Sequence, residues 1–226
     1  MSLRIGVALF GIGEIFKLLK VRLKYTIFVR SALLGFLDSV INVLSKRAKL
    51  VAIFNVAYFC SIFIVVLIAQ FLFPPPVYLD EPLAESLGFF GNDWFTIFVV
   101  IFVFNLIVSA FVVVTLPGML FFPLSVAFLV LRAVLWGLLV YSLPSWFFLV
   151  VLPTVAVEGE AYVVAAVIGT VIGLSWVRPD WMFKDEKLSR LGALKVTLRE
   201  GMHLYAVVVL LLLAAAIIET VTMMYI

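Results

Sequence analysis

The chain has 226 residues, of which 66% are hydrophobic and 13% are charged, whereas an ordinary soluble domain carries about 25% charged residues. This composition excludes a water-soluble globular protein, because no soluble core needs so many apolar residues in such long uninterrupted stretches. The 16 basic and 13 acidic residues leave a net charge of only +3, so we do not expect a nucleic-acid-binding protein.

The amino-terminal segment, residues 1–49, is strongly basic. It carries nine Lys or Arg residues, and its acidic residues are Glu14 and Asp38. Between Ile27 and Leu44, polar residues recur at every third or fourth position opposite an apolar face, which is typical of an amphipathic helix. We expect amphipathic helices of this kind to lie in the headgroup plane of the membrane, and docking of a cytoplasmic partner protein is the alternative.

Five apolar stretches follow, and about 20 apolar residues are enough for a helix to cross the hydrocarbon core of a bilayer. Proline residues end the first three stretches. The fourth stretch is interrupted by Glu158, Gly159 and Glu160. Because neither half is a comfortable full span, we predict a broken or re-entrant helix there. The predicted spans are residues 50–73, 94–116, 119–143, 145–177 and 204–226.

The distribution of Lys and Arg residues predicts the orientation of the chain. Residues 1–49 are basic, whereas the loop of residues 74–93 contains no Lys or Arg, so the amino terminus is expected in the cytoplasm. The loop of residues 178–203 is basic again and is predicted to be a second cytoplasmic amphipathic segment. The fourth stretch must therefore make an odd number of net crossings, which places the carboxyl terminus outside.

Together these features predict an all-α, polytopic helical protein of the cell membrane with about five net transmembrane crossings and amphipathic interfacial helices. Residues 1–49 would form the cytoplasmic basic segment. Residues 50–226 would form the transmembrane helical bundle, including the cytoplasmic loop 178–203. The lipid bilayer is the first expected partner.

Five polar side chains fall within the predicted hydrocarbon zone, where a charge at the centre of a helix costs about 2.5–3.5 kcal/mol on insertion. Arg132 and Asn105 lie near the middle of their spans, so we expect them at one depth. A contact of Arg132 with Glu158 or Glu219 would neutralise its charge. The residues either fix the packing of the helices or line an ion or solute pathway. The predicted polar cluster consists of Asn105, Arg132, Glu158, Glu160 and Glu219.

A G-x-x-x-G motif, formed by Gly169 and Gly173, lies in the second half of the fourth stretch. Small residues at this spacing let two helices approach closely. We predict that the motif packs against another helix of the same chain, and homodimerisation is the alternative.

Catalytic chemistry has little support in the sequence. One cysteine, Cys60, and one histidine, His203, exclude a disulfide framework and a zinc site built from several Cys or His ligands within one chain. His203 lacks Ser and Asp residues placed for a hydrolase triad, and glycine-rich phosphate-binding loops are absent. We expect no catalytic residue, no metal site and no cofactor.

Residues 153–173 read P-T-V-A-V-E-G-E-A-Y-V-V-A-A-V-I-G-T-V-I-G, and this segment resembles the stage II sporulation protein M family of integral membrane proteins. The family pattern is approximately P-H-G-x-x-E-x-P-A, followed by a small-residue helix with spaced glycines. Thr154, Val155 and Glu160 stand where the family has histidine, glycine and proline. The matching residues are Pro153, Glu158, Ala161, Gly169 and Gly173.

Two further segments are similar to the family in matching order. The closing L-L-L-A-A-A-I-I-E-T-V-T places Glu219 on the glutamate of the family's last helix. Phe104 and Asn105 are similar to its F-x-x-N pattern, whereas Arg132 replaces a family asparagine. The resemblance covers roughly residues 83–226.

The resemblance implies a scaffold, because the family member of spore-forming bacteria belongs to a membrane complex that anchors cell-wall-degrading enzymes during engulfment. We therefore expect a non-catalytic scaffold or complex subunit with membrane or cytoplasmic protein partners. The alternative is an ion or small-solute transporter or channel that uses the buried acidic residues. The two differ in hydration, since a scaffold buries these acids in dry, paired contacts, whereas a transporter exposes them to a cavity.

Overall fold

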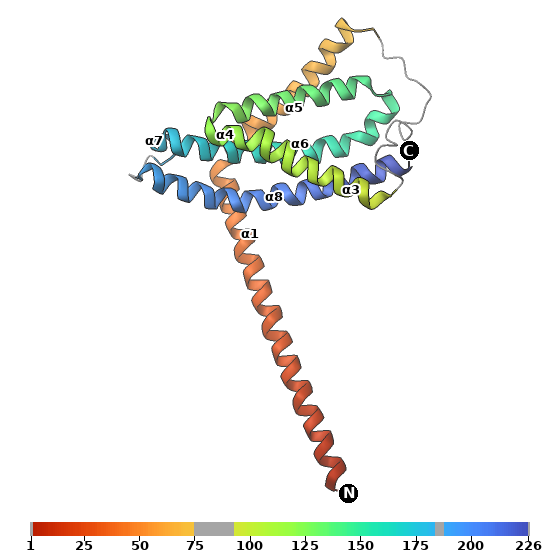
Figure 1. Ribbon diagram of the computed structural model, residues 1–226, viewed down its shortest axis with the longest axis vertical. Helices are drawn as coiled ribbons and strands as arrows, with labels where there is room; N and C mark the ends of the chain where they lie inside the picture. The colour runs from red at the N-terminus through yellow and green to blue at the C-terminus, as the bar shows by residue number, and fades with distance from the viewer. Residues whose placement is uncertain (1, 75–92, 184–187, 226) are drawn as a thin grey trace. The chain divides into compact units, whose positions relative to one another are not determined.

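The computed structural model describes residues 2–74, 93–183 and 188–225, and these ranges are helical with short connections and contain no strand. The predicted all-α fold is confirmed. Figure 1 shows the helices, which are α1 (Ser2–Leu72), α3 (Trp94–Val103), η2 (Phe104–Thr115), α4 (Leu116–Leu120), α5 (Pro123–Ser142), α6 (Ser145–Val177), α7 (Pro179–Met182) and α8 (Arg190–Tyr225).

The chain divides into two compact units, Met1–Asn42 and Val43–Ile226. The first unit contains the amino-terminal part of α1, which is a single helix from Ser2 to Leu72. The second unit contains the rest of α1 and all the later helices. Every residue of the predicted polar cluster therefore belongs to the second unit.

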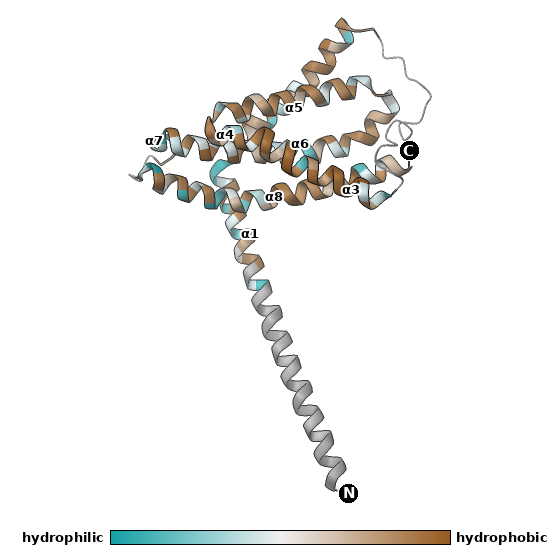
Figure 2. Ribbon diagram, viewed as in Figure 1, coloured by the Kyte–Doolittle hydropathy of each residue, from teal (hydrophilic) through white to brown (hydrophobic). Residues whose placement is uncertain are grey.

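Five helical segments are long and apolar enough to cross a membrane, as predicted. Hydrophobic residues dominate the later helices, as the brown colour of much of α3, α5 and α8 shows (Figure 2). The chain is therefore a multi-pass helical membrane protein. The segments are Leu33–Leu72, Trp94–Leu120, Pro123–Ser142, Trp146–Val177 and Arg190–Met224.

The predicted break in the fourth span is wrong, because α6 is one continuous helix. Its acidic residues do not interrupt it, since neighbouring helices supply partners for both carboxylates. Gly159 lies between them and lets α1 approach the α6 backbone, because a Cβ atom there would lie only 2.6 Å from Cε1 of Tyr58. Pro153 is also accommodated inside α6, with an exposed side chain.

The predicted interfacial helices are helical but are not separate elements. Residues 27–44 continue into the first span within α1, and residues 190–203 continue into the last span within α8. Neither segment contains a proline, so the ladder of backbone hydrogen bonds runs on without a stop. Within the predicted loop 178–203, the short helix α7 is the part that forms its own element.

Helix α6 is the central helix of the second unit. All residues from Ala161 to Gly173 are buried. Helices α8, η2, α4 and α5 all pack against α6, and Figure 1 shows α6 between α5 and α8. This arrangement explains why hydrophobic residues occur all round α6, since such a helix is surrounded by other helices or lipid.

The middle of the second span is a π-helix, η2. Its hydrogen bonds join residues five apart, so such residues lie nearly above one another. The buried residues follow this spacing in two adjacent rows, 105, 110 and 115 in one and 109 and 114 in the other. They are Asn105, Ser109, Ala110, Val114 and Thr115.

Candidate functional site

An ion pair between α5 and α6 forms the centre of the polar cluster. Nη2 of Arg132 lies 2.9 Å from Oε1 of Glu158. The Glu158 side chain is 2% exposed and the Arg132 side chain 18%, so the pair is enclosed by the bundle. Of the two partners predicted for Arg132, the structure selects Glu158. A buried pair of this kind needs further hydrogen bonds to offset the loss of hydration.

Tyr162 supplies those further hydrogen bonds. It follows Glu158 by one helical turn on α6, so both side chains lie on the same face. The Tyr162 hydroxyl accepts a hydrogen bond from Nη2 of Arg132 at 2.6 Å and donates to Oε1 of Glu158. The guanidinium group also lies over the Tyr162 ring, 4.6 Å from its centroid. Sequence reasoning missed this residue, although its four-residue spacing from Glu158 was a usable signal.

Asn105 joins the cluster from η2. Oδ1 of Asn105 lies 3.1 Å from the Tyr162 hydroxyl, and this contact links Asn105 to the ion pair. The contact agrees with the prediction that Asn105 and Arg132 lie at one depth. Ser109, on the next turn of η2, lies 3.5 Å from the same Oδ1. Three of the five predicted residues, Asn105, Arg132 and Glu158, are therefore in one hydrogen-bonded network.

The other two predicted residues lie outside this network. Glu160 faces α1, where its Oε2 accepts a hydrogen bond of 3.3 Å from Nδ2 of Asn55. Glu219 on α8 is half-buried. In the described parts of the chain, no three His, Cys, Asp or Glu side chains gather as metal ligands.

Two aromatic residues with polar atoms complete the surroundings of the ion pair. Tyr58 of α1 is fully buried and packs against α6 at Gly159. Trp136 of α5 is buried and follows Arg132 by one turn. The Tyr58 hydroxyl and Nε of Arg132 are buried without a hydrogen-bond partner among the described residues.

The two glycines of the G-x-x-x-G motif pack within the chain. A Cβ atom at Gly173 would lie 2.0 Å from the carbonyl oxygen of Gly118, and one at Gly169 would lie 2.7 Å from that of Thr115. Both glycines are buried in the interior of the bundle. The motif thus brings α6 against α4 and the end of η2, as small residues allow.

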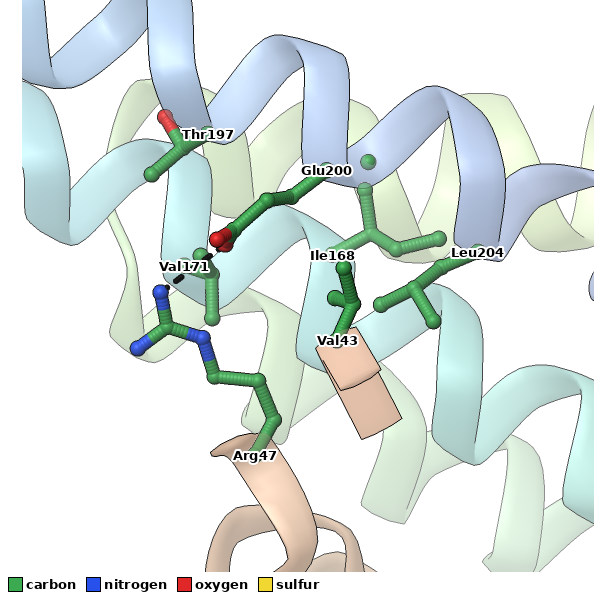
Figure 3. A pocket seen from close by; sticks show the side chains of 8 residues that line it. Val43, Arg47, Ile168, Val171, Thr197, Glu200 and Leu204 are labelled. Atoms are coloured by element: carbon green, nitrogen blue, oxygen red, sulfur yellow. Dashed lines mark hydrogen bonds and ion pairs between the residues drawn. The ribbon is translucent and has the colours of Figure 1, made fainter. Parts of the chain in front are cut away.

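A second ion pair lies where α1, α6 and α8 meet (Figure 3). Nη2 of Arg47 is 2.9 Å from Oε2 of Glu200, and Lys46 lies 3.9 Å from the other carboxylate oxygen. The adjoining pocket, lined on its apolar side by Val43 and Ile168 among others, has a volume of about 10 Å³. This space holds no more than about one water molecule, so it is too small for a solute.

A protein-family model described as Stage II sporulation protein M matches residues 7–222, nearly the whole chain. No curated protein and no solved structure matches the chain. The family match extends the resemblance seen in residues 83–226 through most of α1 as well. With five membrane-spanning helices and a family match of this length, the chain belongs to the stage II sporulation protein M family.

Proposed function

We propose that this protein is a non-catalytic membrane scaffold or complex subunit. The observation that carries the proposal is the closure of the polar cluster: Glu158 is 2% exposed and its carboxylate is bonded to both Arg132 and Tyr162. A buried, paired acid rigidifies a helix bundle, whereas a transport site needs an acid that water or an ion can reach. Family membership supports the same conclusion.

The proposed orientation has the amino terminus in the cytoplasm and the carboxyl terminus outside. The basic residues of segment 1–49 and of loop 178–203 support it, because Lys and Arg residues accumulate on the cytoplasmic side. We propose that these two basic regions meet cytoplasmic partner proteins, and that the lipid-exposed faces of the bundle meet membrane partners. We also propose that further copies of this chain are among the membrane partners, which would give a homo-oligomer.

The second candidate function is an ion or small-solute transporter. It is favoured by Glu160 and Glu219, which are only half-buried and form no salt bridge within the described ranges. Carboxylates inside a membrane bundle commonly mark ion or proton pathways.

Flux measurements in proteoliposomes separate the two functions. Protein reconstituted into vesicles with proton, sodium or potassium gradients is compared with its Glu158→Gln variant, and Asp93→Asn, an exposed acid at a helix end, is the matched control. We expect no flux above that of protein-free vesicles in any sample. Flux that is present in the wild type and the control but lost in Glu158→Gln would overturn the scaffold.

A positive test uses native membranes. After mild solubilisation and chemical cross-linking, the 25.2 kDa chain is expected in an assembly with other proteins or further copies of itself. Recovery of the chain as a lone monomer under conditions that preserve known complexes of the same membrane would contradict the proposal.

A further inference from the structure

Basic and apolar residues share one exposed face of α1 at the start of the first span. Lys46, Lys49, Ile53 and Val56 follow one another at spacings of three or four positions, so they lie on one side of the helix. The Lys46 side chain is 56% exposed, and Lys49 is exposed as well. Ile53 and Val56 are 62% and 63% exposed. This face therefore carries two cations, followed toward the carboxyl end of α1 by an apolar stripe.

Contacts of α1 with the bundle turn this face outward. Arg47 points into the bundle, where its Nη2 lies 2.9 Å from Oε2 of Glu200 (Figure 3). Phe54 and Tyr58 are buried on the same side of α1 as Arg47. The Lys46 ammonium group lies 3.9 Å from the other oxygen of Glu200. One carboxylate cannot balance the three cations of residues 46–49, so the exposed face keeps a surplus of positive charge.

The basic end of this face lies at the level of the lipid headgroups. Glu200 follows Thr197 on α8, and the Thr197 hydroxyl lies 2.8 Å from that of Ser175 near the end of α6. The next residue, Trp176, is 48% exposed, and exposed tryptophans gather where the hydrocarbon meets the headgroups. Because Lys46 lies close to Glu200, it is near the same level.

We propose that this face of α1 binds an anionic phospholipid of the adjoining leaflet, with its phosphate held by Lys46 and Lys49 and an acyl chain along the apolar stripe. Each basic residue at a membrane surface adds to the attraction for anionic lipid. The stripe identifies the occupant as a lipid, because a free phosphate ion gains nothing from apolar side chains. The hydrocarbon of one leaflet, about 15 Å thick, matches about ten residues of helix. Exposed residues of the same face continue to Ile64 and Leu67, so the stripe is long enough.

The inference goes beyond the proposed scaffold function and does not depend on it. A scaffold and a transporter can both hold a lipid on this face, and neither ion flux nor cross-linking to other proteins reports on that lipid. Failure of one proposal therefore leaves the other standing.

Lipid titrations followed by native mass spectrometry test the inference on the full-length protein in neutral detergent micelles. The probes are phosphatidylglycerol and phosphatidylcholine with identical acyl chains, and the apparent Kd of the first bound lipid is measured for each. We expect phosphatidylglycerol to bind more tightly. Lys46→Gln/Lys49→Gln should weaken its binding by at least about tenfold and leave phosphatidylcholine unchanged. Equal Kd values for the two lipids, or an unchanged phosphatidylglycerol Kd in this variant, overturn the inference.

A matched variant separates a lipid site from general surface charge. Arg178→Gln/Arg190→Gln also removes two exposed cations at the same end of the bundle. These arginines lie above buried residues of their helices, two turns away at Val171 on α6 and Thr197 on α8, and not above an exposed apolar stripe. This variant should bind phosphatidylglycerol as the wild type does. A loss equal to that of the lysine variant would reduce the effect to surface charge and overturn the inference.

A headgroup without acyl chains distinguishes a lipid from a free phosphate compound. Glycerol 1-phosphate at millimolar concentration should not displace phosphatidylglycerol from the wild type, because it cannot use the apolar stripe. Displacement would assign the site to soluble phosphates and overturn the lipid. Lys46→Arg/Lys49→Arg keeps both charges and should retain the wild-type Kd; a loss there as large as in the glutamine variant would contradict binding through charge.

Discussion

The Arg132–Glu158 pair is the most costly feature of the bundle at the scale of single residues. Each ion alone would be strongly unfavourable in hydrocarbon, and the pair is tolerated because Tyr162 and Asn105 extend it into a hydrogen-bonded network. Such networks are more sensitive to the loss of one member than to the neutral replacement of both ions.

This sensitivity predicts the effect of breaking the pair. Arg132→Met leaves Glu158 without its cation, so we expect a loss of about 3–5 kcal/mol in the free energy of unfolding. The double variant Arg132→Met/Glu158→Gln should recover most of that loss, because no unpaired charge remains. Unfolding in mixed detergent micelles measures both.

The exposed part of the second ion pair provides the control. Lys46 is 56% exposed and lies 3.9 Å from Glu200, so Lys46→Met should change the unfolding free energy by less than about 1 kcal/mol. If Arg132→Met were as mild as Lys46→Met, the Arg132–Glu158 pair would not stabilise the bundle.

Asp93 caps the start of α3 and predicts a pH dependence. Its carboxylate accepts hydrogen bonds from the Thr96 hydroxyl at 2.8 Å and the Thr96 backbone N–H at 3.1 Å, and these hydrogen bonds lower the pKa of Asp93. A lowered folded-state pKa stabilises the fold above the ordinary aspartate pKa of about 3.9, and this contribution is lost as the pH falls through the lower value.

We therefore expect Asp93→Ala to lower the thermal midpoint at neutral pH. Below the folded-state pKa of Asp93, the wild type has also lost its charged cap, so the difference between the two proteins should nearly vanish. Midpoints recorded across an acidic pH series check this; a difference that grows toward low pH would refute it.

At the scale of helices, glycines determine how closely α6 can be surrounded. Gly169 and Gly173 lie against backbone atoms of η2 and α4, and backbone cannot move aside as a flexible side chain does. The close approach also lets Thr115 donate a hydrogen bond of 3.1 Å to the carbonyl oxygen of Ala165. Both the packing and the hydrogen bond between these helices therefore depend on the lack of a side chain at Gly169 and Gly173.

The contact at Gly173 gives a stability prediction at this scale. A Cβ atom there would lie 2.0 Å from the carbonyl oxygen of Gly118, so Gly173→Ala should separate the helices and destabilise the protein by about 1–3 kcal/mol. Gly35→Ala is the matched control, because nothing lies within 4 Å of its Cβ position. That variant should be neutral or stabilising by up to about 1 kcal/mol, since alanine favours the helix. Equal effects in the same unfolding assay would disprove the packing argument.

At the scale of the whole molecule, we expect the five long apolar segments of the described ranges to place the two ends of the bundle on opposite sides of the membrane. Single-cysteine labelling checks the orientation. In a background with Cys60→Ser, Ser189→Cys should react with a membrane-impermeant maleimide only after permeabilisation of the cells. Ser142→Cys, at the carboxyl-terminal end of α5 and on the expected outer side, should react in intact cells. Both serines are exposed in the structure. The reverse pattern of labelling would invert the topology.

The sequence by itself determined that the chain lies in lipid, that it is all-helical with five spans, and which family it belongs to. These properties follow from composition, span length and local motifs, each of which can be read along a single segment. The sequence also marked Asn105, Arg132 and Glu158 as polar residues within the hydrocarbon zone, and it predicted a common depth for Asn105 and Arg132. The prediction from sequence that α6 is broken was wrong. Glu158 and Glu160 do not interrupt the helix, because other helices supply partners for their carboxylates.

Only the tertiary structure decided which residues pair with the polar side chains inside the bundle. It paired Arg132 with Glu158 and not with Glu219, turned Glu160 toward Asn55, and packed Tyr58 of α1 against Gly159. Such contacts depend on the rotation of each helix about its axis and on which helices are neighbours. Both are set by packing across the whole bundle, where close approach at small residues selects one arrangement among many that satisfy the same hydrophobic pattern.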